Sequence, residues 1–122
     1  MFNKDEKTTR DAETIIGPSV KVKGDFQGGG NLIIEGEFEG NIETTGDIRA
    51  GEKSKIVANI KASEAIIHGT LVGDITLSGL LELGSKANIN GNIKSSSLQV
   101  NTGAIINGTI NMPTNTGFES EN

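Results

Sequence analysis

The chain has 122 residues, enough for one domain, but with four Phe and no Trp or Tyr it lacks the rings that usually fill a globular core. Its formal net charge of −5, with 11 Lys and Arg against 16 Asp and Glu, argues against a nucleic-acid partner, because phosphate binding needs clustered cations. The absence of cysteine excludes disulfides and thiolate metal sites.

The first segment, residues 1–14, is rich in Lys, Asp, Glu and Thr, which is typical of a disordered tail. It contains no apolar run of the length that a secretory signal needs, and no stretch of the chain approaches the length of a membrane span. We therefore expect a soluble, cytoplasmic protein.

A repeat follows and occupies most of residues 15–111. Its unit has five residues, with apolar residues at the first and fifth positions and a small residue at the third. The small residues of successive copies lie 15 to 18 positions apart. Because apolar and small positions alternate with outward ones, the unit has the side-chain period of a strand. The six copies are residues 22–26, 38–42, 56–60, 71–75, 89–93 and 106–110.

A shorter unit, two apolar residues separated by one residue, lies between the copies. Three short segments per coil, with turns between them, bring the chain back above itself at the inter-strand spacing of about 4.8 Å. The pattern thus predicts an all-β fold, a single-stranded parallel β-helix (β-solenoid) of about six coils. The pairs are Leu32 with Ile34, Ile48 with Ala50, Ala65 with Ile67, Leu81 with Leu83, and Leu98 with Val100.

In such a fold, equivalent residues of successive coils form inward columns. We expect one column from the start of each repeat, one from its end and one from the shorter unit. The first contains Val22, Phe38, Ile56, Leu71, Ile89 and Ile106; the second Phe26, Ile42, Ile60, Ile75, Ile93 and Ile110; the third Leu32, Ile48, Ala65, Leu81 and Leu98.

The small residues and their neighbours are expected to form two further columns. Gly24, Gly40, Ala58, Gly73, Gly91 and Gly108 would face a narrow interior that excludes larger side chains. The next residues in each copy would face outward and hydrogen-bond along the stack; they are Asp25, Asn41, Asn59, Asp74, Asn92 and Thr109. In the turns, Gly36, Gly51, Gly69 and Gly84 are expected to adopt positive φ.

The last segment, residues 112–122, is rich in Asn, Thr, Glu and Ser and is predicted to be a second disordered tail. No charged or helical cap is evident beside either terminal coil, so both ends would present unpaired strands. Identical ends of this kind can stack into a filament, and the alternative is that the short tails fold back over them.

The coil period, the I-x-G-x-I recurrence, the flanking Pro18 and Pro113 and the small size together resemble the bactofilins, a family of bacterial cytoskeletal proteins. The resemblance covers residues 15–111. It implies a right-handed β-helix between disordered tails, no cofactor, and nucleotide-independent assembly into non-polar filaments by alternating head-to-head and tail-to-tail contacts. The N-terminal interface would then contain Ile15, Ile16, Val20 and Val22, and the C-terminal interface Ile105, Ile106 and Ile110.

The resemblance extends to partners. Many family members begin with a membrane-targeting Met-Phe followed by basic residues, and Met1, Phe2, Lys4 and Lys7 are similar, although Asp5 and Glu6 depart from the pattern. On this hypothesis the filaments lie at the cytoplasmic face of the inner membrane and act as a scaffold for cell-shape or cell-wall machinery, with cell-wall enzymes as partners. Neither nucleic acid nor nucleotide is an expected partner.

The alternative function is that of a solenoid binding module or a hexapeptide acyltransferase, which is a left-handed β-helix with strict coils of 18 residues. The coils of 15 to 17 residues depart from that rule, and His68, the sole histidine, is expected to be a surface residue. The run Gly28–Gly30 is interpreted as a wide turn, and Glu35, Glu37 and Glu39 as a solvated outward face. We therefore expect no enzymatic activity, no catalytic residue and no metal site.

Overall fold

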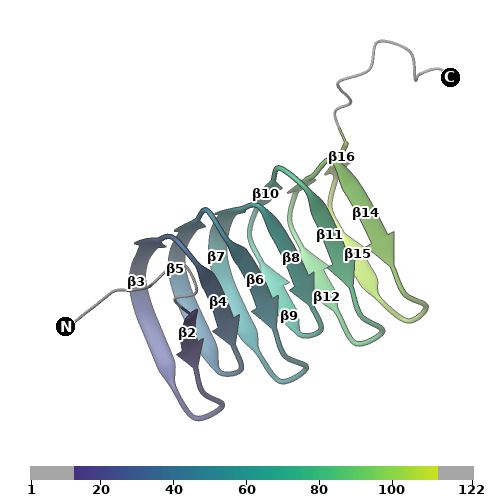
Figure 1. Cartoon of the computed structure of the whole chain (residues 1–122). Coiled ribbons are helices and arrows are strands. Elements are labelled where there is room, and N and C mark those ends of the chain that lie inside the picture. The colour runs from purple at the N-terminus through teal and green to yellow at the C-terminus, as the bar shows by residue number, and fades with distance from the viewer. Residues whose placement is uncertain (1–12, 113–122) are drawn as a thin grey trace, which may run out of the picture.

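The computed structural model describes residues 13–112, and within them every regular element is a β-strand. The strands are stacked in parallel into a column of about six coils, as predicted. Figure 1 shows the coils side by side, with β2 and β3 at one end and β14, β15 and β16 at the other.

Each coil has three faces. The third face is a six-stranded parallel sheet formed by the strands of the shorter unit. Its strands are β2 (Glu13–Ile16), β4 (Asn31–Ile34), β6 (Asp47–Ala50), β8 (Glu64–Ile67), β11 (Leu80–Leu83) and β14 (Ser97–Val100).

The first face precedes the small residue of each repeat and the second face follows it. In the first three coils one strand of eight residues forms both faces; these strands are β3 (Lys21–Gly28), β5 (Glu37–Thr44) and β7 (Lys55–Ala62). In later coils the strand is interrupted at the small residue. The first face then contains β9 (Thr70–Val72), β12 (Asn88–Asn90) and β15 (Ile105–Asn107), and the second face β10 (Ile75–Leu77), β13 (Ile93–Lys94) and β16 (Ile110–Asn111).

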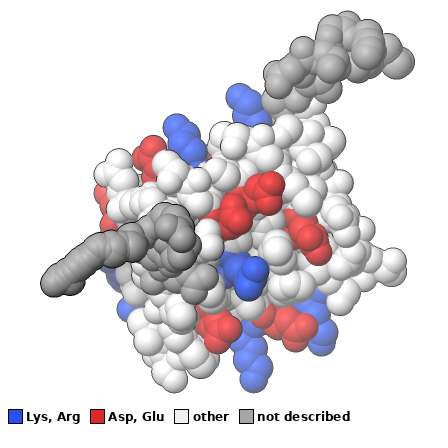
Figure 2. Space-filling view, in the orientation of Figure 1, with Lys and Arg blue, Asp and Glu red and all other residues white. Residues whose placement is uncertain are grey.

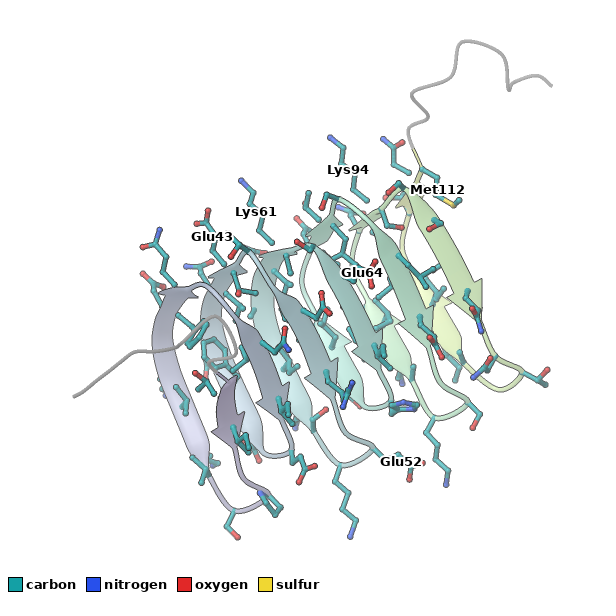
Figure 3. All side chains as sticks on the ribbon, in the orientation of Figure 1. Glu43, Glu52, Lys61, Glu64, Lys94 and Met112 are labelled. Carbon is teal, nitrogen blue, oxygen red and sulfur yellow. The ribbon has the colours of Figure 1, made fainter. Side chains whose placement is uncertain are left out.

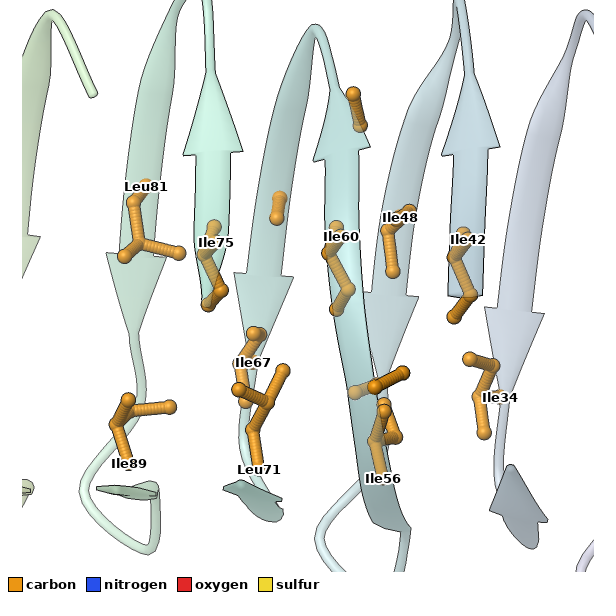
Figure 4. Packing of buried hydrophobic residues seen from close by; sticks show 14 of the residues in the cluster. Ile34, Ile42, Ile48, Ile56, Ile60, Ile67, Leu71, Ile75, Leu81 and Ile89 are labelled. Carbon is orange, nitrogen blue, oxygen red and sulfur yellow. The ribbon is translucent and has the colours of Figure 1, made fainter. Parts of the chain in front are cut away.

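The strand registers confirm the three predicted apolar columns. Ile56 pairs with Phe38 on one side and with Leu71 on the other, and Ile60 lies between Ile42 and Ile75 in the same way. In the four middle coils the members of these columns are buried, and they form one continuous core along the axis (Figure 4). Alternation of inward apolar and outward polar residues thus determines the register, because a slip of one residue would expose the whole column.

Two inward columns lie at the corners and were not predicted. One contains the buried Ser54, Gly69 and Ala87, and the other the buried Thr44, Ala62, Leu77 and Ser95. The hydroxyl groups of Thr44 and Ser54 donate to the carbonyl oxygens of Gly30 and Gly51, each at 2.7 Å. Local hydrogen bonds of this kind allow polar residues to be buried at a corner.

The small-residue column is present, but its cause differs from the predicted one. Gly91 has a φ of 147° and Gly40 a φ of 139°, a region that other residues rarely adopt. A Cβ atom on Gly91 would also overlap the carbonyl oxygen of Gly73 in the preceding coil. The constraint is therefore backbone conformation and the close approach of two coils, rather than a narrow interior.

The prediction of positive φ at Gly36, Gly51, Gly69 and Gly84 is wrong, because the positive-φ glycines of the described residues lie elsewhere. Close approach explains three of them. A Cβ on Gly36 would overlap backbone oxygens of the preceding coil, one on Gly69 would lie 2.5 Å from the Gly51 oxygen, and one on Gly84 would overlap the His68 ring. At Gly51 a Cβ would make only ordinary contacts.

The outward polar column is confirmed. Asn41 donates to the Asp25 carboxylate at 3.0 Å, Asn59 donates to the Asn41 side-chain oxygen at 3.4 Å, and the backbone N–H of Asp74 donates to the Asn59 side chain at 3.4 Å. The backbone N–H of Asn92 donates to Asp74, and Thr109 donates to Asn92 at 2.6 Å. This continuous chain of hydrogen bonds connects all six coils beside the glycine column.

Replacing Gly91 with Ala tests the explanation for the small-residue column. We expect the free energy of unfolding to fall by about 2 kcal/mol or more, because Ala has to adopt a strained φ and displace a neighbouring carbonyl. The matched control Gly51→Ala should change it by less than about 0.5 kcal/mol. Urea unfolding followed by circular dichroism provides the measurement, and equal stability of the two variants would contradict the explanation.

Candidate self-assembly interfaces

The N-terminal end of the column is formed by β2 and β3. Within residues 13–112, β2 pairs only with β4 and β3 only with β5, so one edge of each strand is unpaired. Both strands also carry the first members of inward columns. An open edge of this kind is a template for another strand.

The four residues predicted for this end have different environments. Ile16 is buried, with 6% of its surface exposed, and Val22 is half-buried at the end of the first apolar column. Val20 is exposed in the turn before β3. Ile15 points outward on the third face, where it pairs with Ile33, and is 63% exposed. Val22 is thus the predicted residue that ends an inward column and presents apolar surface along the axis, and Val20 adds exposed apolar surface in the adjoining turn.

The C-terminal end is formed by β14, β15 and β16, each of which pairs with a single strand among the described residues. Ile106 is half-buried and Ile110 is 45% exposed, because each ends an inward column that has no further coil above it. Ile105 is 51% exposed but lies in an outward position of the first face. Ile106 and Ile110 are therefore the predicted residues that face along the axis.

Other apolar residues, not predicted for the interfaces, also lie at the two ends. Phe26 is partly buried at the N-terminal end, as are Leu98 and Ala104 at the C-terminal end, and Val100 and Met112 are exposed (Figure 3). The period of the repeat could have identified Phe26 and Leu98 as end residues, because Phe26 is the first member of one column and Leu98 the last member of another. Together with the predicted residues, they give each end an apolar centre inside a ring of unpaired backbone.

The two ends differ in charge. The last coil, residues 95–112, contains no charged residue, whereas the first coil carries Lys21, Lys23 and Asp25. The C-terminal end of the third face, over β14, is accordingly uncoloured in Figure 2. A C-terminal end can thus meet an identical end without repulsion between like charges.

The other candidate sites of the sequence have simpler explanations. His68 is half-buried and faces outward, and its backbone N–H donates to the Ala50 carbonyl. Glu37 and Glu39 lie 3.9 Å from the ammonium groups of Lys21 and Lys23 in the preceding coil, whereas Glu35 lies in the turn before β5 and not on the same face. No cluster of three or more metal-ligating side chains occurs in residues 13–112.

Several predictions concern residues outside the described range. These are the membrane-targeting residues Met1, Phe2, Lys4 and Lys7, and nearly all of the two predicted tails. At the N-terminal end the first strand begins at Glu13, two residues before the predicted start of the core. No helix of the described part is long and apolar enough to cross a membrane.

A family model described as "Bactofilin: Polymer-forming cytoskeletal" matches residues 14–111. Over 50 residues the chain is 40% identical to bactofilin BacN of Myxococcus xanthus; this match covers 41% of the chain and 44% of that relative. The chain thus matches less than half of the length of this curated relative.

A solved structure is also similar. It is a cryo-EM reconstruction of Thermus thermophilus bactofilin double helical filaments, with a TM-score of 0.69 and 25% sequence identity. The match covers 82% of this chain and 99% of that chain.

Truncating one apolar column at two positions tests whether the end surface is available to a partner. In single units Ile89→Ala should lower the free energy of unfolding by about 2–5 kcal/mol, because Ile89 is fully buried. Ile106→Ala should cost about half as much, since part of its side chain already faces solvent. Urea unfolding at a concentration that keeps units single provides the measurement, and equal losses would mean that the end of the column is covered.

Proposed function

The chain belongs to the bactofilin family of polymer-forming cytoskeletal proteins, and from this premise we propose that it assembles end to end, without nucleotide, into non-polar filaments. The filaments act as a scaffold, and the protein has a structural rather than a catalytic role. The observation that carries the proposal is that both ends of the column formed by residues 13–112 have strand edges without a partner in that range, around an apolar centre.

Strand pairing and apolar burial are sufficient to drive this assembly. When two ends meet, unpaired N–H and C=O groups gain partners, and the half-exposed Val22, Phe26 and Ile106 become buried. Neither contribution requires the energy of nucleotide hydrolysis. Across a like-to-like junction the paired strands run antiparallel, whereas within the column they run parallel.

Like-to-like contacts suit the charge difference between the ends. A tail-to-tail contact joins two uncharged coils, whose exposed apolar residues include Ile110. A head-to-tail contact would instead add the neutral Ile105 and Asn107 beside Lys21 and Lys23, which gain no ion pair beyond those with Glu37 and Glu39. We therefore propose alternating tail-to-tail and head-to-head junctions, and the latter contain charges of both signs.

We extend the proposal to the membrane and to partners. Burial of Phe2 in a bilayer contributes about 2–3 kcal/mol, and Lys4 and Lys7 about 1 kcal/mol each near anionic lipid. One unit would bind weakly, but a filament multiplies the contacts. The filaments would then lie at the cytoplasmic face of the inner membrane and position cell-wall enzymes or other cell-shape machinery. As the solved relative forms double helical filaments, we include pairing of two filaments in the proposal.

Placing a charge at the C-terminal end tests the assembly. Purified protein should form filaments without added nucleotide, and Ile110→Arg should leave dimers joined through their N-terminal ends, or single units, because an unpaired cation would be buried at each tail-to-tail junction. Negative-stain microscopy and analytical ultracentrifugation provide the measurement.

The matched control is Ile66→Arg, which places the same cation at a half-buried, outward position of β8 in the middle of the column. It should leave end-to-end assembly intact. Wild-type protein that stays single at every concentration, or Ile110→Arg filaments of normal length, would overturn the proposed assembly.

Deleting residues 2–7 tests the membrane contact. Filaments of the deletion variant should form normally but no longer sediment with liposomes that contain anionic lipid, because the apolar and basic residues of the segment are lost. The control is full-length protein with neutral liposomes, which should bind less. Undiminished sedimentation of the deletion variant would disprove the anchor.

A further inference from the structure

The outward side of the first face is divided in charge along its length. Its two outward columns run from coil 1 to coil 6, and their rungs are fixed by the strand registers. In these columns the first three coils contribute five charged residues and one valine, and the last three coils contribute no charged residue. One column contains Lys21, Glu37, Lys55, Thr70, Asn88 and Ile105, and the adjacent column contains Lys23, Glu39, Val57, Val72, Asn90 and Asn107.

Two exposed valines lie at the middle of this face. Val57 and Val72 occupy paired rungs of neighbouring coils, and 43% and 40% of their surfaces are exposed. Outward positions of a solvated strand are normally polar, and the residues above and below the two valines are Glu39 and Asn90. The valines thus form a small apolar patch at the boundary between the charged and uncharged halves.

We propose that this first face is the surface through which two filaments of the chain pair side by side. The paired units run in opposite directions, so that a two-fold axis passes between coils 3 and 4 and places Val57 of one unit opposite Val72 of the other. In filaments of alternating head-to-head and tail-to-tail junctions, this pairing shifts one filament by one unit along the axis relative to the other. The same contact between units then recurs at every unit. The inference rests on the proposed end-to-end assembly.

Charge favours this direction of pairing. With units antiparallel, Glu37 and Glu39 lie opposite the neutral Asn88 and Asn90, and Lys55 lies opposite Thr70. With units parallel and in register, each outward column would instead lie opposite the other column of the second unit, so that Lys21 would face Lys23 and Glu37 would face Glu39, and like charges directly opposite each other are destabilising. Antiparallel pairing is thus the direction without like-charge contacts.

The uncharged half also continues across a proposed end interface. Ile105 lies on this face in the terminal coil, so a tail-to-tail junction joins the uncharged halves of two units into one band. Each uncharged band is six coils long, which is also the combined length of the two charged halves on either side of a head-to-head junction. A second filament with a stagger of one unit therefore brings every uncharged band against charged halves along the whole length.

The size of the face explains why pairing would need a filament. Six coils at about 4.8 Å and a width of about 10 Å give roughly 300 Å² per unit. A stable interface buries about 800 Å² on each partner, so two single units should not pair. In a filament the contacts add because the units are linked.

The other faces are less suited to this contact. The outward column of the second face is entirely polar, and its Glu43, Lys61 and Lys94 project into solvent (Figure 3). On the third face, the charged Arg49 lies between Ile33 and Ile66, and charged side chains cover the middle of that face in Figure 2. On the first face the adjacent outward aliphatic residues, Val57 and Val72, lie at the middle of the column, whereas the outward pair of the third face, Ile15 and Ile33, lies at its N-terminal end.

The substitution Val72→Arg tests the surface. It places a cation opposite Val57 and beside Lys55 of the second filament, so filaments should still form but as single strands, with half the mass per length of the wild type. Scanning transmission electron microscopy measures the mass per length, and negative staining the length. Ile66→Arg, the same cation on the third face in the same coil, should leave the mass per length at the wild-type value.

The outcomes separate this inference from the proposed function. Loss of filaments in the wild-type chain would overturn end-to-end assembly itself. Filaments that are normal in the wild type but single-stranded without any substitution, that remain paired in Val72→Arg, or that become single in Ile66→Arg would overturn the assignment of the first face alone.

Cross-linking tests the direction of pairing, because the chain contains no native cysteine. Chains that carry Glu39→Cys and chains that carry Asn90→Cys, distinguished by tag length, are assembled together and treated with a short bismaleimide. Antiparallel pairing predicts mixed dimers between the two kinds of chain. Dimers formed predominantly between two Glu39→Cys chains would indicate parallel pairing and contradict the proposal.

Discussion

Parallel stacking of one coil on the next is the constraint on which the rest of this molecule depends. Each backbone segment hydrogen-bonds to the equivalent segment about 17 residues away, so that equivalent side chains form columns. The middle of every column is covered by coils on both sides, but the first and last members are not. An arrangement that stabilises the interior in this way necessarily leaves two open ends within the described column.

The close approach of successive coils also explains the residues that contribute no apolar surface. At the corner between the first and second faces, the carbonyl of one coil occupies the space that a Cβ of the next would need, as Gly73 does for Gly91. Beside this corner the chain of Asn, Asp and Thr side chains hydrogen-bonds from coil to coil. Glycine permits the turn, and the polar side chains stabilise the same turn from the outside.

Much of this fold could be predicted because a period of two within strands and about 17 between coils leaves few alternatives for residues such as Ile56 and Ile60. The features that were not predicted are those in which no apolar residue marks the position. Thr44 and Ser54 are buried because hydrogen bonds to nearby carbonyls satisfy them, which their polarity alone does not indicate. Positive φ was assigned to Gly36 instead of Gly40, since backbone conformation at a corner depends on the neighbouring coil.

The candidate interfaces were predicted less completely than the fold, because a residue in the terminal coil can face outward or along the axis. Ile105 and Ile106 are adjacent in sequence, yet Ile105 is on the outside of the first face and Ile106 ends an inward column. Val57 and Val72 lie at outward positions, which the inward columns of the repeat do not identify, although an aliphatic residue at an outward position is itself a signal.

The central claim is that the column of coils continues from unit to unit through like-to-like ends. The axial repeat of filament images from cryo-EM tests it most directly. Non-polar stacking predicts a meridional reflection at about 4.8 Å together with a repeat of two units, about 58 Å for twelve coils. A repeat of one unit, about 29 Å, along a single strand of the filament, or filaments without the 4.8 Å reflection, would contradict the account.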